Sequence, residues 1–97
     1  MITQYQITDA GWTAISTAGQ SGSCWMDDDN GGTGTFAADV RILHAAAEPG
    51  VATSVGKRVL RTKSNNDVLI LDADGAWDIF FARAMPGKPG LLSVDMV

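Results

Sequence analysis

The chain has 97 residues, of which 45% are hydrophobic, and its 11 acidic and 7 basic side chains give a formal net charge of −4. This length suits one domain with one modest core and excludes two independent domains, and the apolar content argues against disorder. The negative charge disfavours nucleic acid as the main partner, and no apolar run is long enough to cross a bilayer as a helix. We therefore expect a single domain over residues 1–97, with no nucleic-acid or membrane partner.

Short apolar segments, separated by turn residues, follow one another along the chain. No segment predicts a helix, and a polar, glycine-rich loop occupies residues 28–35. Predicted strands cover residues 2–8, 12–17, 23–27, 39–45, 56–62, 68–71, 77–84 and 91–97. About eight short strands with regular turn signals predict an all-β fold, an antiparallel β-sandwich or jelly roll, with a small β-barrel as the alternative.

The strongest local pattern lies between residues 67 and 85. Two apolar segments, 68–71 and 77–84, flank Asp74-Gly75, a dipeptide typical of a tight type I′ turn. This pattern predicts a β-hairpin at the centre of the domain.

Both faces of the second hairpin strand are largely apolar, whereas a strand with one face in water alternates apolar with polar residues. One face belongs to the core. The other is covered either by a loop of the same chain or by another copy of the protein. The second alternative gives a hypothetical subunit interface made of Trp77, Ile79, Phe80 and Phe81.

The acidic loop is a second candidate site. Four of its residues, Asp27, Asp28, Asp29 and Asn30, form a hypothetical partner-facing loop. Their oxygens suggest calcium, but the spacing lacks the Gly and Glu positions of an EF-hand, and a solvated turn explains the same composition. We predict neither a metal nor a cofactor.

His44 and Cys24 are the only histidine and the only cysteine. Catalysis by His44 would need a nucleophile such as Ser and an orienting acid such as Asp39 or Asp95, and no nucleophile-elbow motif is present. Cys24 has no disulfide partner within the chain and reads as a packed thiol. We therefore predict a protein that is not an enzyme.

Three tryptophans, at positions 12, 25 and 77, are many for this length. Buried tryptophan in a β-sandwich core is the favoured interpretation. The alternative is that Trp12 or Trp25 is exposed and stacks on sugar rings.

The early Gly11-Trp12 strand, the segment DADGAWDIFFARA at 72–84, the following Gly/Pro turn and the terminal LLSVDMV strand together resemble small all-β virion proteins of tailed bacteriophages. The resemblance is to proteins of the capsid decoration and head-fibre kind. It implies a protein of the virion, assembled in the bacterial host cytoplasm, that self-associates, commonly as a trimer. Its other partner would be the major capsid protein or another virion protein. The alternative is a receptor- or carbohydrate-binding module of a phage fibre or spike.

Overall fold

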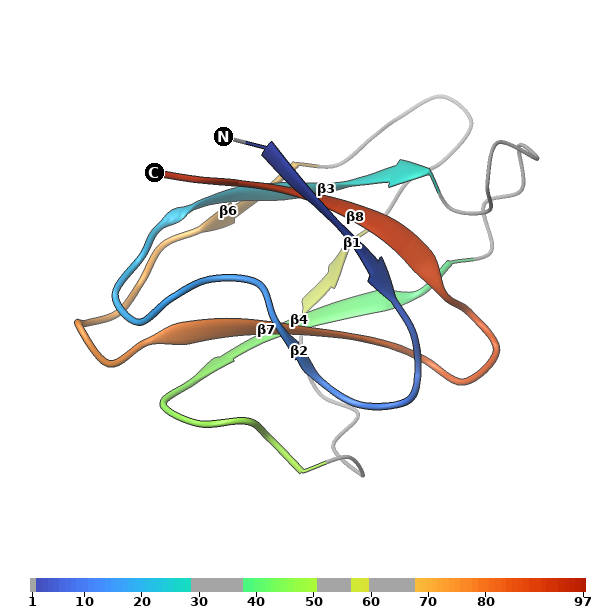
Figure 1. Ribbon diagram of the computed structural model, residues 1–97, viewed down its shortest axis with the longest axis horizontal. Coiled ribbons are helices and arrows are strands. Elements are labelled where there is room, and N and C mark those ends of the chain that lie inside the picture. Colours follow the sequence, from blue (N-terminus) through green and yellow to red (C-terminus); the bar gives the residue numbers. More distant parts are fainter. Residues whose placement is uncertain (1, 29–37, 51–56, 60–67) are drawn as a thin grey trace.

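Two four-stranded antiparallel β-sheets form the described part of the computed structural model (Figure 1). The structure describes residues 2–28, 38–50, 57–59 and 68–97. The strands are β1 (Ile2–Ile7), β2 (Thr13–Ala14), β3 (Gly22–Asp28), β4 (Val40–Ala45), β5 (Lys57–Val59), β6 (Val68–Leu71), β7 (Ile79–Ala84) and β8 (Gly90–Met96). The all-β prediction is confirmed, and the described residues include no helix that could span a membrane.

The strand order joins the first half of the chain to the second half. The first sheet has the order β1-β8-β3-β6, and the second has the order β2-β7-β4-β5. Each of the first four strands therefore pairs with its counterpart counted from the other end: β1 with β8, β2 with β7, β3 with β6 and β4 with β5. Of the connections between successive strands, the one from β4 to β5 stays in one sheet, and the others pass from one sheet to the other.

The core lies between the two sheets and follows the alternation of side chains along each strand. In β7, for example, Phe80, Ala82 and Ala84 point into it. The core cluster consists of Ile7, Ile15, Cys24, Met26, Val40, Ile42, Leu71, Phe80, Ala82, Ala84, Leu92 and Val94. Each large aliphatic or aromatic member contributes about 1.5–3 kcal/mol through its removal from water.

The opposite face of β7 is also covered. Phe81 and Trp12 are each about 95% buried, although neither belongs to the core cluster. Phe81 is paired with Ala14 of β2, and the Trp12 indole Nε1 donates a hydrogen bond of 3.1 Å to the Gly50 carbonyl oxygen. The apolar character of both faces of β7 is therefore explained by burial at Phe80 and Phe81 within a single chain.

The predicted hairpin across Asp74-Gly75 is wrong. β6 pairs with β3 in the first sheet, whereas β7 pairs with β2 and β4 in the second, so residues 72–78 cross between the sheets. A type I′ turn needs positive φ angles, and neither Asp74 nor Gly75 has one. Both segments are strands, as their alternation predicts. Alternation identifies a strand but does not identify the neighbouring strand.

The turn at residues 86–90 follows its sequence signature. Pro86 and Gly87 occupy its two central positions, Gly87 has φ +73°, and the Lys88 N–H donates to the Met85 carbonyl at 3.0 Å. This is the geometry of a type II turn, in which the third residue requires a positive φ and is commonly glycine.

The buried thiol of Cys24 gives a first prediction. Its side chain is 0% exposed, and burial raises its pKa to about 12. Because the thiolate is the reactive form, a disulfide reagent at about pH 8 should modify the native chain two to three orders of magnitude more slowly than the urea-unfolded chain. Equal rates for the native and unfolded chains would contradict this placement of β3.

Candidate functional site

A cleft of about 360 Å³ opens between β4 and β6, at the edge of the molecule where the first sheet ends. β5 pairs with Val40, Arg41 and Ile42 in the first half of β4, and the cleft extends along the second half. We call this cavity the β4–β6 cleft. Its walls are formed by Ile42, Leu43, His44, Leu69, Ile70, Leu71, Asp72 and Phe80.

The strand β6, which forms one wall of the β4–β6 cleft, exposes large apolar side chains. Ile70 and Val68, both on the outward face of the edge strand β6, are 70% and 58% exposed. In the neighbouring strand β3, Ser23 lies opposite Ile70, and the half-buried Trp25 lies opposite Val68. An edge strand with exposed aliphatic side chains is a natural site for pairing with another chain.

His44 lines the same cleft, oriented by a buried carboxylate. Its Nδ1 lies 2.9 and 2.8 Å from the two carboxylate oxygens of Asp78, whose side chain is 0% exposed. The Asp78 carboxylate also accepts a 2.8 Å hydrogen bond from the Asp74 N–H. Because Nδ1 of His44 faces the Asp78 carboxyl group, Nε2 is the second hydrogen-bonding atom of the ring.

Two aromatic rings flank the His44 imidazole. Phe80, its cross-strand neighbour in β7, has a ring centroid 5.8 Å away, and Trp77 has one 6.5 Å away. The Trp77 side chain is 49% exposed. His44 therefore connects the exposed indole with the apolar wall of the β4–β6 cleft.

The acid that orients His44 differs from the two sequence candidates. Asp39 instead binds Arg41, with Nε 2.8 Å from Oδ1, and this hydrogen bond raises the pKa of the Arg41 guanidinium. Asp95 lies on β8, opposite Ile2 and Ser23. Among the described residues, the hydrogen-bond and ring partners of His44 are Asp78, Trp77 and Phe80, and none of them is a Ser, Thr or Cys.

The four residues of the hypothetical hairpin interface separate into two pairs. Phe80 and Phe81 are each 5% exposed and pack within the single chain. Trp77 is exposed and Ile79 is half-buried. Only Trp77 and Ile79 therefore keep surface for a partner, and Trp77 is continuous through His44 with the β4–β6 cleft.

The hypothetical acidic loop falls mostly outside the described residues. Asp27 and Asp28 end β3, after a change of register between Met26 and Asp28, but their side chains are not described. Asp29 and Asn30 lie outside the described residues. Within the described part of the chain, no three His, Cys, Asp or Glu side chains come together as metal ligands.

Sequence reasoning missed Asp78 and the exposed side chains of β6. A lone Asp inside the apolar run 77–84 was the available signal for Asp78, because a carboxylate there must be exposed or paired. Val68 and Ile70 carried no such signal, because their exposure depends on β6 being an edge strand.

No family model, curated protein or solved structure matches the chain.

The Asp78–His44 pair gives a second prediction. Asp78→Asn puts an amide donor against the Asp74 N–H or the His44 Nδ1–H, so the free energy of unfolding should fall by about 1–3 kcal/mol in urea titrations. Asp74→Asn is the matched control, since the Asp74 side chain is exposed, and it should change that free energy by less than about 0.5 kcal/mol. Equal losses in the two variants would contradict the assignment.

Proposed function

We propose that this chain is a non-enzymatic structural protein of a phage virion, most specifically a capsid decoration or cement protein that self-associates and stabilises the capsid. The observation that carries the proposal is the exposed apolar surface of β6, which forms one wall of the β4–β6 cleft, together with Trp77 beside His44 of the same cleft. Ile70, Val68 and Trp77 are 70%, 58% and 49% exposed. Exposed apolar side chains on a strand that ends a sheet are typical of a surface that is buried against another chain.

We further propose that the two sheets form a jelly roll. Pairing of strand 1 with 8, 2 with 7, 3 with 6 and 4 with 5 is the pattern produced when one long antiparallel hairpin wraps around a core into two sheets. Jelly rolls of eight strands are common in viral capsid domains and also in lectins and cupins. This is an analogy of fold, and it supports the virion proposal without excluding a binding role.

The mode of action would be addition of weak apolar contacts at many equivalent positions. Each contact contributes about 25 cal/mol per Å² of apolar surface removed from water, less the cost of association. A homotrimer joined at the β4–β6 clefts, seated on the major capsid protein, would distribute these contacts across the seams of a shell. Polar side chains of β1, at the other edge of the first sheet, would stay in solvent.

The alternative function, a receptor- or carbohydrate-binding module, was first suggested by the possible exposure of Trp12 or Trp25. Trp12 is buried, so its ring is not open for stacking on a sugar, and Trp25 is half-buried. A different surface of the molecule, a cleft lined by Tyr5 and Gln20, favours that function.

A substitution in β6 tests the self-association proposal. Ile70→Lys places a charge in the proposed contact at a position that is already solvated in the single chain, so folding should be retained. The association constant, obtained from light-scattering mass through a dilution series, should fall at least about tenfold.

Gln4→Lys is the matched control, because it adds the same charge to the outward face of β1, at the opposite edge of the same sheet. This variant should associate like the wild type. A wild-type chain that stays monomeric at every concentration and does not sediment with purified phage capsids would refute the proposal.

A further inference from the structure

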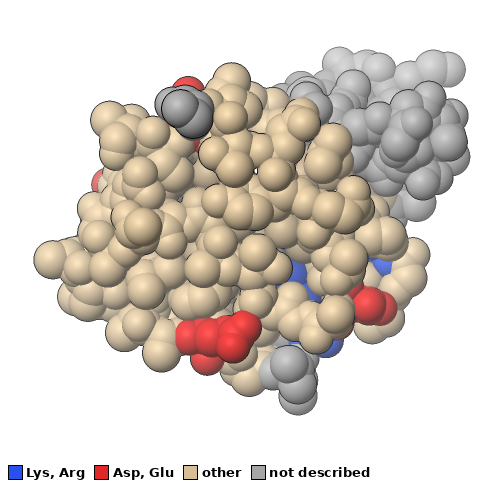
Figure 2. Space-filling view, viewed as in Figure 1, with Lys and Arg blue, Asp and Glu red and all other residues tan. Residues whose placement is uncertain are grey.

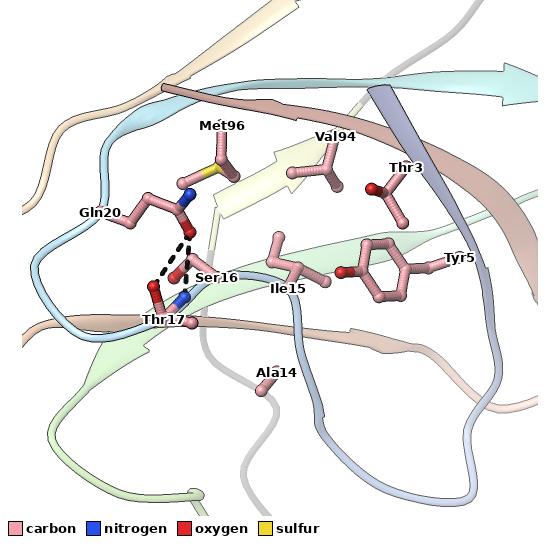
Figure 3. A pocket seen from close by; sticks show the side chains of 9 residues that line it. All are labelled: Thr3, Tyr5, Ala14, Ile15, Ser16, Thr17, Gln20, Val94 and Met96. Atoms are coloured by element: carbon pink, nitrogen blue, oxygen red, sulfur yellow. Dashed lines mark hydrogen bonds between the residues drawn. The ribbon is translucent and has the colours of Figure 1, made fainter. Parts of the chain in front are cut away.

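A second cleft, of about 410 Å³, opens between the sheets at their other edge, where β1 and β2 are the end strands. We call it the β1–β2 cleft. Figure 3 shows side chains from three parts of the chain directed toward it: inward-facing residues of β1, the end of β8, and the segment that leaves β2. The lining residues are Thr3, Tyr5, Ala14, Ile15, Ser16, Thr17, Gln20, Val94 and Met96.

The β1–β2 cleft is a consequence of the shortness of β2. β2 has two residues, against six in β1, and beyond it the chain turns toward the other sheet. The backbone N–H of Ile15 still donates to the Phe80 carbonyl at 2.9 Å, but the Phe80 N–H is taken by the Ser16 hydroxyl at 2.9 Å. A side chain thus ends the strand pairing, and the space that a longer β2 would fill stays open.

The polar groups in this cleft are uncharged. They are the hydroxyls of Thr3, Tyr5, Ser16 and Thr17 and the amide of Gln20. Figure 2, viewed as in Figure 1, shows that this face is mostly uncharged, with basic atoms to the right of the centre and acidic groups mainly toward the lower border. Because no described lining residue is charged, the cleft offers no ion partner to an anionic or cationic ligand.

The amide of Gln20 is held in a fixed orientation. Its Oε1 accepts hydrogen bonds from the Thr17 N–H at 3.1 Å and the Thr17 hydroxyl at 3.2 Å (Figure 3). With the oxygen occupied, the Nε2 hydrogens are the part of the amide that remains for a ligand. The Tyr5 hydroxyl points into the cleft in the direction of Ile15, and no hydrogen bond joins it to another described residue.

The floor of the β1–β2 cleft is apolar. Ile15 and Val94 are each 1% exposed and belong to the core cluster, and Met96 packs against that cluster. The cleft therefore combines an apolar base with a rim of hydroxyl and amide groups.

We propose that the β1–β2 cleft binds a neutral saccharide. Sugar rings carry hydroxyls that both donate and accept hydrogen bonds, which matches the hydroxyl and amide rim, and their C–H faces suit the Tyr5 ring and the apolar floor. The volume lies in the range of small-molecule sites, about 300–1,000 Å³. This proposal gives the carbohydrate-binding alternative a site and does not depend on self-association through the β4–β6 cleft.

The test is a titration of the ¹⁵N-labelled chain with three neutral disaccharides, namely maltose, lactose and N,N′-diacetylchitobiose, followed by amide chemical shifts. At least one sugar should shift the amides of Tyr5, Ile15, Ser16, Thr17 and Gln20 in a saturable way. Sialic acid, an anionic sugar, should leave them unchanged, because the cleft lacks a cation. Absence of saturable shifts with all three disaccharides, or shifts confined to another surface, would overturn the proposal.

Tyr5→Phe removes only the hydroxyl and should weaken binding about three- to tenfold, as expected for one lost hydrogen bond. Gln4→Ala, on the opposite face of the same strand, is the matched control and should bind like the wild type. Unchanged affinity in Tyr5→Phe would overturn the assignment of the site. Shifts of the same amides on dilution without sugar would assign the cleft to a second copy of the chain instead.

Discussion

The structure depends on how it accommodates the carboxyl group of Asp78, which is 0% exposed. A buried carboxyl group needs hydrogen-bond partners, and here they come from two directions: the Asp74 N–H in the same loop and the His44 imidazole on β4. The main chain of the same residue is also fixed, since the Asp78 carbonyl accepts from the Gly19 N–H at 2.8 Å. One residue thus joins the 72–78 crossing to β4 and to the connection between β2 and β3.

The hydrogen bond from the Gly19 N–H to the Asp78 carbonyl brings two crossing segments together. The connection from β2 to β3 and the connection from β6 to β7 both pass between the sheets, and the Ala73 N–H donates to the Ser21 hydroxyl at 2.9 Å. Gly19, with φ +78°, lies close to Ala76, so a side chain at that position would be strained. These contacts hold one end of the molecule and determine where β7 enters the second sheet.

The two clefts then follow from the edges of the sheets. At the edge formed by β6, the cleft has an apolar wall that includes His44, and Trp77 lies next to His44. At the edge formed by β1, the short β2 leaves a cleft with hydroxyl and amide groups. Short edge strands generally limit uncontrolled pairing between sheets, and the short β2 also leaves the β1–β2 cleft open.

Sequence patterns predicted the strands well and their partners poorly. The bounds of β6 agree with the expected 68–71, and the terminal strand and the 86–90 turn also lie where alternation and Pro-Gly chemistry place them. The Asp74-Gly75 hairpin failed because local turn propensity competes with long-range pairing, and here the pairing of β6 with β3 prevailed.

Sites were harder to predict than strands for the same physical reason. The role of Asp78 depends on His44, which is 34 residues away in the chain, and the exposure of Ile70 depends on which strand ends the sheet. Neither dependence leaves a local pattern. The apolar faces of β7 suggested a subunit contact, but Phe80 and Phe81 are each only 5% exposed within the single chain.

The central claim is that residues 72–78 cross between two sheets instead of closing a hairpin, and nuclear Overhauser contacts between backbone protons test it most directly. The account predicts contacts between Ser23 and Ile70, and between Ile42 and Ala82, with none between β6 and β7 across Asp74-Gly75. A continuous ladder of contacts between residues 68–71 and 77–84 would contradict the account, because it would place both strands in one sheet.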